Sequence, residues 1–137
     1  MKNNFLKFHE FKTNSVVYID STEIGIISTE TSNSSRNVSK LHFFNTTNVI
    51  SVYVNETPEK IYANCKLDNF IRLHVYPSNN TVLVNINSVS VLDSIDLNGS
   101  SCTKIFFKNS INIKPFTVYE SPDKIYKMLS DNEQNKP

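Results

Sequence analysis

Short segments rich in Val, Ile, Phe, Tyr and Thr, separated by polar stretches, predict strands rather than long helices. Residues 5–11 and 16–20 are two such segments with a polar turn at 12–14 between them, so they predict a hairpin. Residues 29–39 are rich in Ser and Asn and predict a surface loop. Three further strands are predicted around that loop, at 24–28, 40–44 and 49–54.

The same succession of patterns returns in the second half of the chain. Residues 70–76 and 81–85 predict a second hairpin, with its turn at 77–80. The polar stretch 93–101 predicts a second surface loop. The strands predicted around this loop lie at 89–92, 103–107 and 116–119.

Two short helices are predicted from their first residues. Thr57-Pro58 and Ser121-Pro122 each place a hydroxyl where it can accept a backbone N–H, and then a proline at the first helical position, where no N–H is needed. An acidic residue follows and meets the positive end of the helix dipole. We therefore expect helices over 58–65 and 122–129.

The two halves also share residues, not only patterns. Residues 40–63 align without gaps with residues 104–127 and are identical at ten of 24 positions. Chance would give about one or two identities with ordinary residue usage. Residues 5–27 align with residues 70–92, again without gaps. The sequence therefore predicts a tandem duplication.

The duplication sets the expected fold. We expect a β-rich α+β protein made of two homologous repeats of mostly antiparallel strands, each closed by a short C-terminal helix. Repeat 1 would cover residues 1–65 and repeat 2 residues 66–129, with a polar tail at 130–137. Because a repeat of about 60 residues is marginal alone, we expect one compact unit in which the repeats pack as a pseudo-two-fold pair around a shared core.

Composition narrows the classes of function. The formal net charge of +1 excludes a polybasic nucleic-acid tail and an acidic solvating segment. Two glycines leave no room for a glycine-rich phosphate-binding loop. The first ten residues hold no continuous apolar stretch, so we expect no signal peptide, and we expect the two cysteines to be free thiols.

One face of each predicted first strand carries an unusual order of residues: aromatic, basic, His, aromatic. Such a face can bind nucleic acid, because rings stack on bases while cations meet phosphates. A second core layer is the alternative interpretation. We take this face as the candidate binding site, and it consists of Phe5, Lys7, His9, Phe11, Phe70, Arg72, His74 and Tyr76.

Other polar residues offer little chemistry. No further His, Cys or carboxylate recurs beside both His9 and His74, so we expect no metal and no cofactor. Glu56 and Glu120 directly precede a helix cap, and we expect them to interact with the helix N-terminus rather than to act as acid or base. No motif places a nucleophile beside a base, and we therefore expect no enzyme and no catalytic residues.

The second part of each repeat resembles a known family. A strand ends in Val-x-Glu and runs into a capped helix, in residues 54–61 and again in residues 118–125. This pattern resembles the small FlbD-like (swarming motility) proteins of bacteria, each about one repeat long, and similar short proteins of phages and mobile elements. The resemblance implies a small accessory or interaction protein and carries no catalytic residue over to this chain.

These observations favour a non-enzymatic structural or assembly protein. The abundance of Asn, Ile and Lys suits an AT-rich genome, so we expect a bacteriophage protein that belongs to a virion or an accessory complex, located in the virion or the host cytoplasm. Its partners would be proteins, either phage structural proteins or the chain itself, and no membrane. Two alternatives stay open: a nucleic-acid-binding module that uses the aromatic-basic faces, and a small-ligand-binding inhibitor of host defence with a pocket at the repeat seam.

Overall fold

The computed structural model describes residues 4–32, 36–45, 49 and 51–134. In the first half, a 3-10 turn over Ser21–Glu23 joins the second and third strands. The elements of this half are β1 (Phe5–His9), β2 (Val16–Asp20), β3 (Ile24–Thr31), β4 (Asn37–Phe43), β5 (Ser51–Val54) and the helix α1 (Pro58–Asn64).

The second half has the same order of elements, including a 3-10 turn over Ile86–Ser88. Its elements are β6 (Phe70–His74), β7 (Thr81–Asn85), β8 (Val89–Leu97), β9 (Ser100–Phe107), β10 (Phe116–Val118) and α2 (Pro122–Gln134). Strands make up 50% of the chain and helices 19%, and the sheets are antiparallel. The predicted β-rich class with two helices is therefore confirmed.

Both predicted hairpins are present in the structure. β1 pairs with β2, with His9 opposite Val16, and β6 pairs with β7, with His74 opposite Thr81. Their turns contain Asn14 and Asn79, whose φ angles are 57° and 64°. Asn accepts this left-handed backbone conformation better than most residues, which explains why it stands at both turns.

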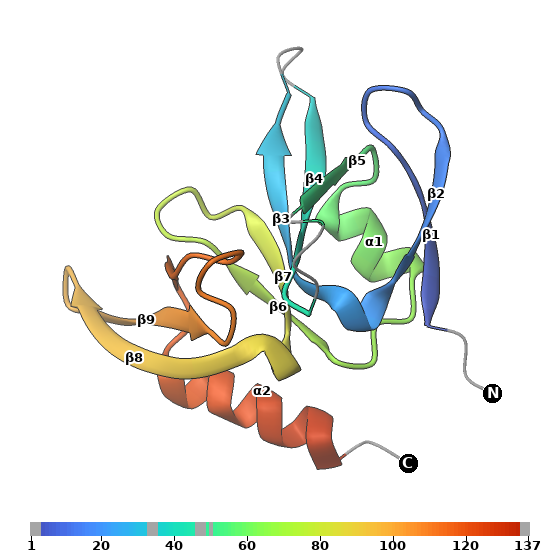
Figure 1. Cartoon of the computed structure of the whole chain (residues 1–137). Helices are drawn as coiled ribbons and strands as arrows, with labels where there is room; N and C mark the ends of the chain where they lie inside the picture. Colours follow the sequence, from blue (N-terminus) through green and yellow to red (C-terminus); the bar gives the residue numbers. More distant parts are fainter. Residues whose placement is uncertain (1–3, 33–35, 46–48, 50, 135–137) are drawn as a thin grey trace.

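A five-stranded sheet joins the two halves of the chain (Figure 1). Its order is β5-β4-β3-β7-β6, so three strands of the first half continue into the hairpin of the second. We call the antiparallel contact between β3 and β7 the internal junction. Its residue pairs are Ile26↔Val84, Ile27↔Leu83 and Ser28↔Val82.

Isolated bridges connect this sheet to the two smaller ones. Glu10, just after β1, bridges to Val54 of β5, and Val75, just after β6, bridges to Val118 of β10. Together with the sheet orders, these bridges give the succession β2-β1-β5-β4-β3-β7-β6-β10-β9-β8. β2 and β8 thus stand at the two ends of the succession, on opposite sides of the molecule (Figure 1).

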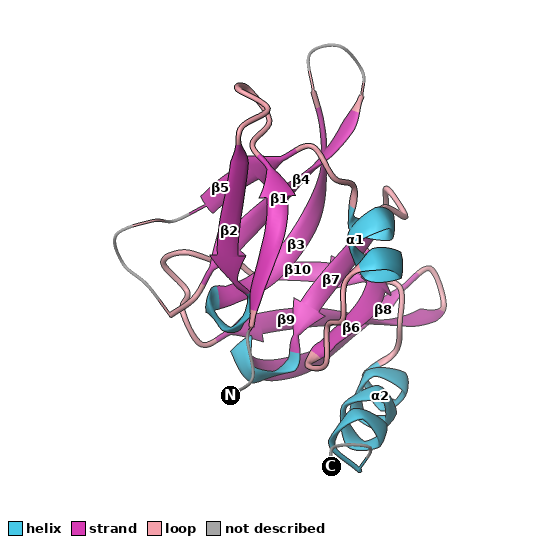
Figure 2. Cartoon of the chain, turned by 90° about the vertical axis from the view of Figure 1, so that its right-hand side faces the viewer, coloured by secondary structure: helices cyan, strands magenta, loops and turns pink. Residues whose placement is uncertain are grey.

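Two apolar clusters fill the interior. The first includes Ile61 of α1, and the second includes Ile125 of α2. Neighbouring residues of β3 belong to different clusters, Ile27 to the first and Ile26 to the second, because side chains alternate across a strand. The structure thus has two clusters where we expected one shared core, and the two helices lie apart from each other (Figure 2).

Both predicted helix starts are confirmed. Thr57 Oγ1 accepts the Lys60 N–H at 3.3 Å, and Ser121 Oγ accepts the Lys124 N–H at 3.2 Å. α1 ends at Asn64, one residue earlier than predicted, but α2 continues to Gln134. The predicted end of this helix at residue 129 was therefore wrong, because residues 130–134 continue it and contain no proline or glycine that would end it. Residues 135–137 of the polar tail lie outside the described residues.

The predicted surface loops are shorter than expected. β8 runs to Leu97 and β9 begins at Ser100, so most of the predicted loop over 93–101 is strand. Asn98 and Gly99 form the turn, with φ angles of 54° and 82°. In the first half, β3 runs to Thr31 and β4 begins at Asn37, while residues 33–35 of the predicted loop lie outside the described residues.

Candidate functional site

The eight residues of the predicted binding face do not form one continuous surface. β1 and β6 belong to different sheets. Phe5 is 55% exposed, whereas Phe70, at the same position of β6, is 6% exposed and belongs to the first apolar cluster. Lys7 and Arg72 are both exposed. The two strands therefore have different environments although their residues correspond.

Several aromatic and basic residues of this face make contacts within the chain. The Arg72 guanidinium lies 5.0 Å from the centre of the Tyr62 ring on α1, and the Arg36 guanidinium lies 5.7 Å from that of Phe11. The rings of Tyr76 and Tyr119 are 5.0 Å apart. Rings that pack against neighbouring side chains present less surface for stacking on bases.

The first histidine of the face is held by a carboxylate from the segment before α1. Glu56 Oε1 accepts the backbone N–H of His9 at 3.1 Å, and Oε2 lies 2.7 Å from Nδ1 of the same residue. Burial by itself raises the pKa of Glu56, but hydrogen bonds from the His9 side chain and backbone outweigh it and hold that pKa below its usual value. An ionised carboxylate only accepts hydrogen bonds, so Nδ1 of His9 carries a proton.

The second histidine is held in the same way. Glu120 Oε1 accepts the His74 backbone N–H at 3.0 Å, and Oε2 lies 2.7 Å from His74 Nδ1. The Glu120 side chain is 6% exposed, against 26% for Glu56. We expected both glutamates to face the helix N-terminus; the structure turns both towards histidine, because the end of the first strand of each hairpin lies beside the segment that precedes the helix.

A pocket opens where the two halves meet. It has a volume of about 580 Å³, which falls within the usual range for small-molecule sites. Its walls come from β3 and β4 of the first half and from the β6–β7 turn and the segment 111–116 of the second. Lys40, Lys114 and Glu30 supply charge, and Ile111, 85% exposed, stands at its edge.

His42 also lines this seam pocket. Its Nε2 atom lies 3.1 Å from the Ser28 hydroxyl. Burial, with a contribution from the nearby Lys40 charge, lowers the pKa of His42 to about 4. The imidazole is therefore neutral at physiological pH and can donate or accept one hydrogen bond. Sequence reasoning passed over His42, because it has no counterpart in the second half, where Phe106 stands at the matching position.

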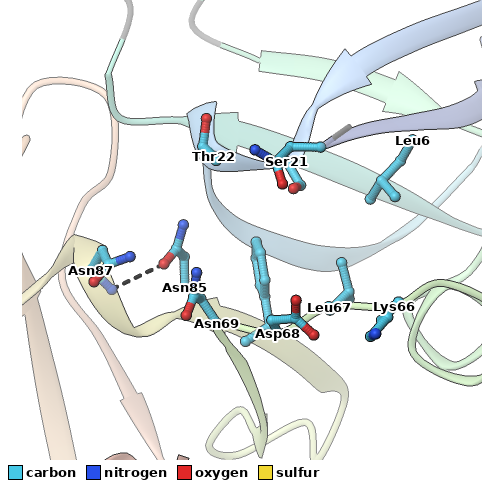
Figure 3. A pocket seen from close by; sticks show the side chains of 11 residues that line it. Leu6, Ser21, Thr22, Lys66, Leu67, Asp68, Asn69, Asn85 and Asn87 are labelled. Carbon is cyan, nitrogen blue, oxygen red and sulfur yellow. Dashed lines mark hydrogen bonds between the residues drawn. The ribbon is translucent and has the colours of Figure 1, made fainter. Parts of the chain in front are cut away.

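A second, smaller pocket lies between the N-terminal hairpin and the connection to β6 (Figure 3). Its volume is about 170 Å³, and its lining is largely polar, with Asn85 and Asn87 on one side. Asn85 is buried and fully engaged: Oδ1 accepts the Asn87 N–H at 2.9 Å, and Nδ2 donates to the Ile24 carbonyl at 2.9 Å. This pocket is small for an organic ligand, and its asparagine has a structural role.

In the described part of the chain, no group of three or more His, Cys, Asp or Glu residues is placed to hold a metal ion. No helix among the described residues is long and apolar enough to cross a membrane. Cys65 and Cys102 are both free thiols, as predicted.

The strands at the two ends of the succession expose apolar side chains. Tyr18 and Val16 of β2 are 62% and 47% exposed, and Val91 of β8 is 50% exposed. Among the described residues, β2 pairs only with β1, and β8 only with β9. Both strands thus combine exposed apolar side chains with an open edge, which is the feature that promotes pairing with another chain.

Comparison of the chain with protein-family models, with curated proteins and with solved structures finds no match. The resemblance to FlbD-like proteins therefore rests on the sequence pattern alone and stays a prediction.

Proposed function

We propose that this chain is a non-catalytic structural or assembly protein that acts through contacts with other proteins. One observation carries the proposal: β2 and β8, on opposite sides of the molecule, each have an open edge and expose Tyr18, Val16 and Val91. Monomeric proteins usually blunt such edges with charges, bulges or covering loops, and β8 does carry a register shift between Val89 and Val91 and the acidic residues Asp93 and Asp96. The corresponding shift in β3 does not prevent the pairing of β3 with β7. The setting we propose, a phage virion or accessory complex, rests on the composition and on the absence of a catalytic motif in the sequence.

The tandem duplication is part of this proposal. Matching strands pair in matching registers: the bridge Glu10↔Val54 corresponds to Val75↔Val118, and both first strands end in a His–Glu pair. The internal junction joins β3 of one half to β7 of the other, and β7 corresponds to β2 rather than to β3. Such a contact between non-equivalent strands supports a head-to-tail arrangement of the repeats instead of the pseudo-two-fold pair that we expected.

Site-specific photo-crosslinking in the cells that produce the protein tests this function. A photoreactive amino acid would replace Tyr18 or Val91 at the open edges, and Tyr53, which is 43% exposed on β5 away from both edges, would serve as the matched control. We expect protein adducts from the two edge positions and fewer from the control. Equal yields at all three positions, or no protein adducts, would contradict the proposal.

Nucleic-acid binding is the alternative to this proposed function. The exposed Lys7 and Arg72 are the cations of the predicted face, and changing both to Ser should leave the fold intact because neither contributes to an apolar cluster. A fluorescent single-stranded oligonucleotide that binds the wild type in a salt-dependent way, and binds this double variant more weakly, would favour the nucleic-acid module.

The seam pocket supports a second candidate function, the binding of a small ligand. Two lysines, one carboxylate and a neutral histidine surround an opening of about 580 Å³. Native mass spectrometry of the protein purified from its source tests this candidate. A bound mass that is lost in the Lys40→Ala/Lys114→Ala variant would support it, and a wild type that shows only the mass of its own polypeptide would contradict it.

A further inference from the structure

We propose that copies of this chain assemble head to tail, with the β8 edge of one copy pairing with the β2 edge of the next in the geometry of the internal junction. The inference rests on the proposed function and names its partner. The internal junction serves as the template, because it joins the same two kinds of strand within one chain.

At the internal junction, each half contributes apolar side chains to the apolar cluster that contains the helix of the other half. Ile26 of the first half is 4% exposed and belongs to the second cluster. Leu83 of the second half is 0% exposed and belongs to the first cluster. The five residues of β7, all buried, show how completely the junction removes this strand from solvent.

The counterparts of these crossing residues are exposed. Val91 corresponds to Ile26 and is 50% exposed, and Tyr18 corresponds to Leu83 and is 62% exposed. β2 pairs with β1 in the same register as β7 with β6, and β8 pairs with β9 in the same register as β3 with β4. Tyr18 and Val91 are therefore exposed because β2 and β8 lack a junction partner, not because their strands are built differently. A second copy that supplies the missing strand would bury both side chains, as the template does.

The template also fixes the register of the proposed contact. Transferring the pair Ile27↔Leu83 to the corresponding residues places Leu92 of one copy opposite Tyr18 of the next. The flanking pairs become Val91↔Ile19 and Asp93↔Val17. Leu92 and Tyr18 would then form an aliphatic–aromatic cross-strand pair, a combination that stabilises antiparallel strands.

The edges lie on opposite sides of the molecule, so one chain can use both at once (Figure 1). A contact between two different surfaces does not end at a dimer: it closes into a ring or continues as a filament, depending on the rotation from copy to copy. Each added copy would repeat the step that the two halves already make inside one chain.

One difference makes the contact between copies weaker than the template. In the internal junction, Nδ2 of Asn85 donates to the Ile24 carbonyl at 2.9 Å. The counterpart of Asn85 is Asp20, and an ionised carboxylate cannot donate to the Val89 carbonyl that would face it. We therefore expect reversible, concentration-dependent association rather than a permanent assembly.

The variant Asp20→Asn places at the β2 edge the same residue, asparagine, that Asn85 provides at the internal junction. The asparagine keeps the oxygen that accepts the Thr22 N–H at 3.0 Å and adds the missing donor. Sedimentation velocity over a wide range of concentration should show association of the wild type, and roughly two- to tenfold tighter association of this variant. Tyr18→Lys and Val91→Lys should abolish it, whereas Tyr53→Lys, on β5 away from both edges, should not. A wild type that stays monomeric throughout would overturn the inference.

Cysteine cross-linking tests the register and the direction. Tyr18→Cys and Leu92→Cys would be made separately in a Cys65→Ser background, and Cys102 stays because it is fully buried. Under mild oxidation, a mixture of the two variants should form a disulfide-linked dimer, since opposite residues of paired strands lie within disulfide reach. Disulfide-linked dimers of either variant alone, at equal yield, would show that like edges pair and would overturn the head-to-tail assembly.

The photo-crosslinking experiment separates this inference from the proposed function. If the adducts at Tyr18 and Val91 contain a second copy of this chain, the proposed function and the head-to-tail assembly are both supported. If the adducts are another protein and the purified chain is monomeric, the proposed function stands and self-assembly fails. If no protein adduct forms at either edge, the proposed function fails as well.

Discussion

Gly25 of β3 lies against Ile113 of the segment between β9 and β10, so closely that a side chain on Gly25 would overlap the Cδ1 atom of Ile113. Both residues are buried, and they belong to different halves of the chain. The absence of a side chain at this glycine therefore lets the two halves approach each other beside the seam pocket, which Ile113 lines.

This contact predicts that Gly25→Ala destabilises the protein by about 1–3 kcal/mol, the usual cost of overpacking a buried site. Ile113→Val removes the overlapping methyl group and should cost about 1 kcal/mol alone. In the double variant the added and removed atoms compensate, so its unfolding free energy, measured by urea denaturation, should exceed that of Gly25→Ala. Additive losses would show that the two positions do not meet.

The two His–Glu pairs predict unequal losses of stability. Glu120→Ala leaves the His74 backbone N–H without its acceptor in a site where the Glu120 side chain is 6% exposed, and we expect a loss of about 2–3 kcal/mol. Glu56→Ala should cost about 1 kcal/mol, because water reaches that pair and replaces the carboxylate. Chemical denaturation of both variants measures the difference, and equal losses would contradict the role of burial.

The sequence was a good guide wherever local chemistry decides the structure. Thr57 and Ser121 cap helices because a hydroxyl before Pro can satisfy an N–H within the next turn, and this needs no distant partner. The β8–β9 hairpin was also within reach, since Asn98-Gly99 is a strong signal for a two-residue turn. The residues around it were interpreted as a loop because a strand with little burial carries polar residues that are also typical of surface loops.

The sites that depend on distant contacts could not be predicted in this way. The separation of 47 residues between His9 and Glu56 recurs as 46 residues in the second half, but only the tertiary contact beside β5 makes the two residues partners. The internal junction is a similar case, because nothing in the sequences of β3 and β7 distinguishes this pairing from others between apolar strands. Tyr18 and Val91 can be compared with buried counterparts only because the structure shows that Leu83 and Ile26 are buried at the internal junction.

The helix caps predict two small, matched losses. Thr57→Ala and Ser121→Ala each remove the hydroxyl that accepts an N–H at the start of a helix, and each should lower the unfolding free energy by about 1 kcal/mol. Thr57→Ser and Ser121→Thr keep the acceptor and should lie close to the wild type. The midpoint of urea unfolding measures all four variants, and an unchanged midpoint for both alanine variants would contradict capping.

His42 predicts how stability depends on pH. Burial and the Lys40 charge lower the pKa of this imidazole to about 4, whereas the unfolded chain takes up the proton at the ordinary value near 6.5. The unfolded state therefore binds more protons between these values, so the contribution of His42 is full above pH 6.5 and is lost as the pH falls towards 4. At about 1.4 kcal/mol per pH unit, the loss can reach about 3 kcal/mol. Glu56, whose pKa is also lowered, adds its own loss below its usual value near 4.5.

A comparison with His42→Gln isolates this contribution. The glutamine amide can still reach the Ser28 hydroxyl but does not titrate, so its variant should lose less stability than the wild type when the pH falls from 6.5 to 4.5. Within that range Glu56 stays ionised in both proteins and cancels in the difference. The measurement is the free energy of unfolding by urea at several pH values. Parallel curves for the two proteins would mean that His42 is protonated in the folded state as readily as in the unfolded chain, and that the seam pocket is open to water at this residue.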